Sequence, residues 1–172
     1  MTARVERLPH GLGGHRTPLQ PDPPLNLNPS TFTLGRMAVP CSPTIELDGI
    51  PYFPRLCEKV RLFAAGELRE DLHGNLGLGM DLWTCQFLGV AYEDLKAKVL
   101  EGASDEEALA WARENGVNRP DHERDWWIAF MKTVGFRDRL ATRLQERLAE
   151  SGLGDRDDLL TMFDYIDADE GR

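Results

Sequence analysis

The sequence predicts an all-α protein: a single compact domain of six or seven short helices that follows a proline-rich N-terminal tail. Apolar residues recur at helical spacings between repeated glycine stops. No window shows convincingly the alternation of a half-buried strand, and residues 31–34 and 44–47 are only weak candidates. With 172 residues and 41% hydrophobic content, the chain is long enough for one well-buried domain and too short for two with a linker.

Residues 1–42 are rich in proline and show no apolar periodicity. Such a segment cannot bury enough apolar surface to fold, so we expect a disordered tail, which can also serve as a partner-binding arm. The helical domain is then expected over residues 43–172. Met37 permits a second interpretation, in which translation starts there.

The first helix is expected over residues 54–65. Pro54 suits the first position of a helix, and Gly66 is typical of a C-terminal stop. Arg55 and Lys59 are four residues apart, so they should share one face of this helix. That face can be a solvated ion-pair surface or one side of a ligand site.

Residues 73–81 interrupt the helical pattern with three glycines and several polar side chains. Glycine permits a positive φ and a close approach of a ligand to the backbone. A short helix over residues 82–88 should follow, capped by Asp81 and ended by Gly89. Its first N–H groups would point back at the glycine segment, an arrangement that can hold an anion. A plain tight connection is the alternative.

The remaining helices are delimited by caps and glycines. The clearest boundary is the capping box of Ser104 and Glu107. Asp138 should cap the penultimate helix, whose leucines repeat every four residues. The expected helices cover residues 92–101, 105–115, 120–133, 139–151 and 155–166.

Composition excludes several classes of function. A net charge of -9 and a pI near 4.9 argue against nucleic acid and anionic membranes as partners, since both require a basic surface. No apolar run approaches the roughly 18 residues that a membrane span needs. Three cysteines without paired spacing indicate neither a disulfide framework nor a zinc site, so we expect a cytoplasmic protein without a metal.

Six segments of the chain stand out together: YFPRLCEKVRL (52–62), HGNLGLGMD (73–81), CQFLGV (85–90), SDEEALAW (104–111), WIAFMKTVGFRD (127–138) and FDYIDADEGR (163–172). Over about residues 43–172 they resemble a bacterial family catalogued as domain-of-unknown-function family 5069. The resemblance implies a bacterial helical domain. It transfers no activity, cofactor or catalytic residue.

Our leading hypothesis is a module that binds a small polar or anionic molecule between the first helix, the glycine segment and a docked C-terminal end. Glycine, histidine, cationic and carboxylate groups would converge there. Docking is expected because Leu159, Leu160, Phe163 and Ile166 form an apolar stripe. The candidate ligand-binding residues are Arg55, Lys59, His73, Asn75, Gly77, Gly79, Asp81, Asp164 and Asp167.

Two hypotheses from other classes stay open. In the first, the protein is an enzyme with His73 as general acid or base and Asp81 or Asp167 as its orienting carboxylate. In the second, it is a protein-interaction adaptor with an exposed apolar patch. The sequence contains none of the common motifs of a nucleophile elbow, a zinc protease or a phosphate-binding loop, and it indicates no cofactor.

Overall fold

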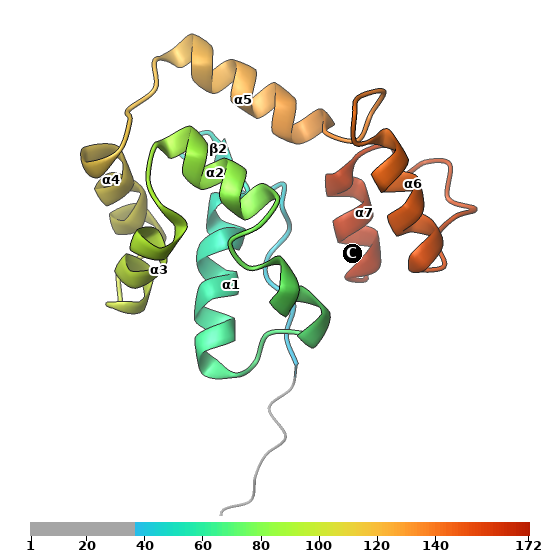
Figure 1. The fold of residues 1–172 in the computed structure, drawn as a ribbon, viewed down its shortest axis with the longest axis horizontal. Helices are drawn as coiled ribbons and strands as arrows, with labels where there is room; N and C mark the ends of the chain where they lie inside the picture. The colour runs from blue at the N-terminus through green and yellow to red at the C-terminus, as the bar shows by residue number, and fades with distance from the viewer. Residues whose placement is uncertain (1–36) are drawn as a thin grey trace, which may run out of the picture. The chain divides into compact units, whose positions relative to one another are not determined.

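The computed structural model describes residues 37–172. Most of the predicted tail and the strand candidate at residues 31–34 therefore lie outside the described residues. Within them the fold is all-α, as predicted, with one short hairpin (Figure 1). The elements are β1 (Glu46–Leu47), β2 (Ile50–Pro51), α1 (Phe53–Ala65), the 3-10 helix η1 (Glu70–Asn75), α2 (Met80–Leu88), α3 (Tyr92–Leu100), α4 (Asp105–Asn115), α5 (Asp121–Thr133), α6 (Ala141–Glu150) and α7 (Met162–Asp169).

Helix α1 forms the centre of the larger apolar core, in contact with α3 and α4. Phe53, Leu56 and Val60 on its inner face are almost completely buried. Burial of each such side chain contributes roughly 1.5–3 kcal/mol. The glycine stop predicted at Gly66 is confirmed, because this residue caps α1 with a positive φ of 71°.

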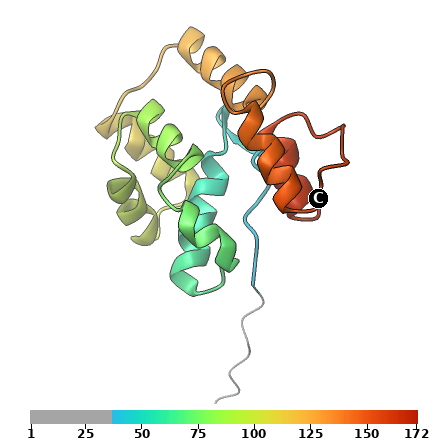
Figure 2. The same cartoon turned by 45° about the vertical axis from the view of Figure 1, so that its right-hand side comes forward.

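A smaller apolar cluster joins α6 to α7, which lie side by side in both views (Figures 1 and 2). Leu144 and Leu148 from α6 pack there with Leu159. The backbone N–H of Met162, at the start of α7, donates to the carbonyl of Val134 at 2.8 Å, which places that end beside the end of α5.

Three predicted helix starts are wrong. Leu140 rather than Asp138 occupies the cap position of α6, which begins at Ala141. Asp81 does not cap α2: Gly79 occupies the cap position, and the Asp81 side chain turns inward. The last helix begins at Met162 rather than near residue 155, because Thr161 and Asp164 form a capping box there. The capping box predicted at Ser104 is confirmed.

The predicted boundary of the tail lies too late in the chain. The carbonyls of Pro40 and Cys41 accept hydrogen bonds from Arg55, and the Ser42 hydroxyl donates to Asp167 at 2.7 Å. Ala38 forms a parallel bridge with Leu68. Residues 38–42 thus contact the helical domain, and polar groups rather than an apolar pattern hold them.

None of the helices that the structure describes is long and apolar enough to cross a membrane.

Candidate functional site

A cavity of about 370 Å³ lies between α1, the η1–α2 segment and the α6–α7 pair. The charged face of α1, the glycine segment and the C-terminal end, which the sequence predicts as the three components of a site, all contribute to its wall. Its lining residues are Tyr52, Arg55, Lys59, Arg69, Asp71, Leu72, Asn75, Leu78, Gly79, Met80, Trp83, Leu140, Arg143, Arg147, Met162, Tyr165, Ile166, Asp169 and Glu170.

One wall of the cavity contains a buried ion pair. The Lys59 ammonium donates to both carboxylate oxygens of Asp81, at 2.9 and 2.8 Å. The Tyr52 hydroxyl donates to the same carboxylate at 2.9 Å. Burial and the nearby Asp81 charge raise the pKa of Tyr52 well above its ordinary value, so the hydroxyl stays protonated. Two of the three Lys59 donors point at Asp81, which leaves one for a ligand.

The glycine segment supports this ion pair through its backbone. The Gly77 N–H donates to Asp81 at 3.0 Å, and Gly77 has a φ of +70°. A Cβ at this position would lie 2.7 Å from the Tyr92 ring. Gly77 is thus required by conformation and space, and it positions Asp81 rather than lining the cavity.

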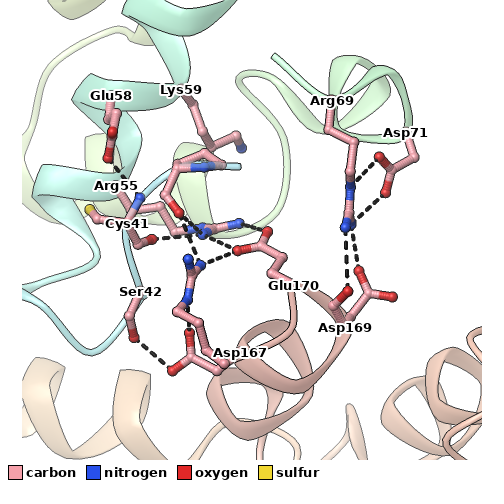
Figure 3. Close-up of polar contacts among 12 residues, drawn as sticks. Cys41, Ser42, Arg55, Glu58, Lys59, Arg69, Asp71, Asp167, Asp169 and Glu170 are labelled. Atoms are coloured by element: carbon pink, nitrogen blue, oxygen red, sulfur yellow. Dashed lines mark hydrogen bonds and ion pairs between the residues drawn. The ribbon is translucent and has the colours of Figure 1, made fainter. Parts of the chain in front are cut away.

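Arg55 and Glu170 form a second buried pair across the cavity wall (Figure 3). Both guanidinium Nη atoms donate to the carboxylate, which also accepts a hydrogen bond from Arg172. Burial alone would lower the pKa of Arg55, but its hydrogen bonds and the charges around it raise the pKa above its ordinary value. The Arg55 Nε is buried and has no hydrogen-bond partner.

Arg69 closes another side of the cavity. It bonds to Asp71 at 2.6 and 2.8 Å and also to Asp169 on α7, as Figure 3 shows. This bridge joins the η1 region to the C-terminal helix. Its hydrogen bonds engage all three guanidinium nitrogens and use four of the five N–H donors, which leaves one hydrogen on Nη1.

Helix α6 presents Arg143 and Arg147 to the cavity, one turn apart on the same face. Their Nη1 atoms pair with Glu146 and Glu150 of their own helix. These glutamates are more than half exposed, where ion pairs contribute little. Both arginines are therefore available to an anion in the cavity.

The charges on the wall differ from those of the whole protein. Five lining residues are cationic and three are acidic, whereas the whole chain carries a net charge of -9. Asp81 lies behind Lys59 and neutralises one of the five. Burial lowers the pKa of Lys59, and Asp81 opposes part of this shift. With Asp81 counted, the wall has one more cation than carboxylates, in a protein that is acidic as a whole.

The structure divides the predicted site residues into three groups. Arg55, Lys59, Asn75 and Gly79 line the cavity. Gly77 and Asp81 support it from behind. His73, Asp164 and Asp167 are not among its lining residues.

His73 is exposed on η1. Its Nε2 lies 2.9 Å from the Leu68 carbonyl oxygen, and its ring packs edge to face on Phe63 with centroids 5.0 Å apart. In the part of the chain that the structure describes, no carboxylate forms a hydrogen bond or salt bridge with this imidazole. The geometry gives it a local structural role.

The two carboxylates have structural partners as well. Asp164 accepts hydrogen bonds from the backbone N–H groups of Leu160 and Thr161, which caps α7. Asp167 pairs with Arg172 at 3.0 Å. Among the described residues, no three His, Cys, Asp or Glu side chains form a group that could hold a metal.

Arg69, Arg143 and Arg147 line the cavity although they are not among the residues predicted from the sequence. The helical periodicity of α6 could have indicated two of these residues. Leu140, Arg143 and Arg147 lie three and four residues apart and therefore share one face of the helix. Arg69 had no such indication. Its place depends on the contact with Asp169, a hundred residues later in the chain.

A family model described as a domain of unknown function (DUF5069) matches residues 37–172, most of the chain. The comparisons with curated proteins and with solved structures gave no match.

Proposed function

We propose that this chain, which belongs to the DUF5069 family, binds a small anionic molecule in the cavity between α1, the η1–α2 segment and the α6–α7 pair. The observation that carries the proposal is the concentration of cations there. Arg55, Lys59, Arg69, Arg143 and Arg147 come from three separate parts of an acidic chain and line one cavity of about 370 Å³.

The pairing of these cations supports an anionic ligand over a cationic one. Arg55 and Lys59 already have buried carboxylate partners, so they supply ordered donors on the wall without an excess of positive charge. Arg143 and Arg147 have only exposed partners that a ligand can replace. These four residues therefore leave two types of donor for a ligand: the third Lys59 hydrogen and the two α6 guanidinium groups.

A thermal-shift screen tests the proposal. Purified protein is heated with inorganic phosphate, citrate, sugar phosphates and nucleotides, because a ligand that binds only the folded state raises the melting temperature. The double variant Arg143→Gln/Arg147→Gln should weaken binding about tenfold, since partly exposed ion pairs contribute up to about 1 kcal/mol each.

The matched control removes the same charge elsewhere. Arg124→Gln/Arg156→Gln deletes two arginines that pair with Asp121 and Asp158 and lie outside the cavity wall. It should keep the affinity of the parent protein. Equal stabilisation of both double variants by every anion would reject the cavity as the binding site, and no stabilisation by any anion would reject the function.

Two alternatives have less support. An enzyme that uses His73 lacks a carboxylate partner for the imidazole among the described residues. An adaptor would use the exposed aromatic side chains of α5, such as Trp126, which is 68% exposed. We also propose a cytoplasmic location, because Cys41, Cys57 and Cys85 all carry free thiols.

A further inference from the structure

We infer that the ligand is an amphipathic organic anion about 10 Å long, whose aromatic or acyl end lies at the α5 side of the cavity and whose acidic group lies among the arginines. The inference rests on the proposed function and adds the chemical class of the ligand. It follows from the way apolar and charged side chains separate along the cavity.

Helix α7 shows this separation directly. Its cavity face begins with Met162, Tyr165 and Ile166 and ends with the acidic Asp169, which Glu170 follows directly after the helix. Seven residues separate Met162 from Asp169, which corresponds to about 10 Å along a helix. One end of the wall is thus apolar, and the other is charged.

Helix α6 repeats the same order. Leu140 precedes the helix, Arg143 lies in its first turn close to the apolar end, and Arg147 lies one turn further along. The two helices run in the same direction. A Cβ added at Gly135 would lie within 3.2 Å of both Leu144 on α6 and the Met162 nitrogen at the start of α7, whereas the Ser151 hydroxyl after the end of α6 lies 3.0 Å from the Tyr165 hydroxyl. Their apolar ends therefore face the same end of the cavity.

The opposite wall completes the apolar end. Trp83 on α2 lines the cavity and packs against Phe130 of α5, with ring centroids 5.9 Å apart. Phe130 lies one turn before Val134, whose carbonyl accepts from Met162. Trp83, Leu140 and Met162 thus gather near the end of α5.

The charged end is defined by the contacts of Arg69 and Arg55 with α7. Arg69 reaches Asp169, and Arg55 reaches Glu170, both at the last turn of that helix. A ligand with only charged groups would leave the side chains of the apolar end in contact with water. A neutral apolar ligand would leave Arg143 and Arg147 without a bound anion. An amphipathic anion satisfies both ends.

Calorimetric titration of the full chain with four probes tests the inference: acetate, 3-phenylpropionate, hexanoate and 3-phenyl-1-propanol. The two larger acids should bind at least about tenfold more tightly than acetate, because they bury an apolar group. The alcohol has the same apolar group without the charge and should bind at least about tenfold more weakly than 3-phenylpropionate.

Leu78→Ser is the informative variant, because Leu78 lines the cavity and is 59% exposed, so its loss spares the core. This variant should weaken the binding of 3-phenylpropionate and leave the affinity for acetate unchanged. The control is Leu160→Ser, at a side chain that is 50% exposed and outside the cavity. The control variant should change the affinity for neither acid.

The outcomes separate the two proposals. Equal affinity for acetate and the larger acids, or no effect specific to Leu78→Ser, would overturn the inference while anion binding stands. Equal affinity for the alcohol and 3-phenylpropionate would overturn it as well. If neither these acids nor the inorganic anions bind, the proposed function fails and the inference fails with it.

Discussion

The Lys59 ammonium and the Asp81 carboxylate form a fully buried ion pair, with both oxygens within 2.9 Å of Nζ. The pair connects α1 to the first turn of α2 and thereby fixes the glycine segment against the centre of the fold. Two further donors, from Tyr52 and Gly77, satisfy the carboxylate. A buried pair with this many hydrogen bonds orients a site even where it adds little net stability.

Asp81→Asn should lower the free energy of unfolding by about 3–5 kcal/mol, because it leaves the buried Lys59 charge without a counterion. Urea unfolding, followed by circular dichroism, measures this change. Glu93→Gln serves as the control, since Glu93 is 74% exposed and pairs with Lys96 on the surface of α3. That variant should lower the free energy of unfolding by less than about 1 kcal/mol.

The double variant Lys59→Met/Asp81→Leu separates charge burial from packing. It removes both charges at similar volume and should be more stable than Asp81→Asn. A double variant less stable than the single one would show that the two side chains contribute through their shape rather than through their charges.

Glu170→Gln should destabilise the protein, because it leaves the buried Arg55 charge without its main counterion. The Arg55 residue is only 2% exposed. We expect a loss of about 3 kcal/mol in the free energy of unfolding. Differential scanning calorimetry can compare it with Asp158→Asn, an exposed partner of Arg156. If the two variants melt at the same temperature, the C-terminal end does not depend on the Arg55 contact.

Cysteine reactivity should show an unusual pH dependence. Burial, with Glu58 nearby, raises the pKa of the half-buried Cys41 to about 12. Because only the thiolate is alkylated, the rate of reaction with iodoacetamide should keep rising with pH well above 9 in the native protein. Mass spectrometry after timed quenching measures this rate.

The denatured chain provides the control for this prediction. In urea the thiol loses its buried surroundings, so its rate should level off near the ordinary pKa of about 8.5. A native Cys41 that also levels off near pH 9 would contradict the raised pKa.

The sequence predicted the helices well where caps and glycines mark their ends. Ser104 and Glu107 form the predicted capping box, and Gly66 and Gly89 cap α1 and α2 as expected. These features depend on local backbone chemistry, which a single sequence contains. The start of α7 was missed because the apolar pattern continues before Thr161, although Leu160 is half exposed.

The candidate site was predictable to a lesser degree. The convergence of the α1 face, the glycine segment and the C-terminal end was expected from residue types, and Phe163 is buried as the predicted docking requires. Roles of single residues were not predictable in the same way. Asp81 looks like a helix cap in sequence, and only its contacts with Tyr52 and Lys59 make it the centre of a buried network.

The measurement that tests the central claim most directly is a crystal structure of the protein soaked in selenate, whose selenium gives an anomalous signal. We expect an anomalous peak inside the cavity, within hydrogen-bond distance of Lys59, Arg143 or Arg147, and no such peak in Arg143→Gln/Arg147→Gln. Selenate peaks confined to surfaces outside the cavity, or equal peaks in the parent protein and the double variant, would contradict an anion site in this cavity.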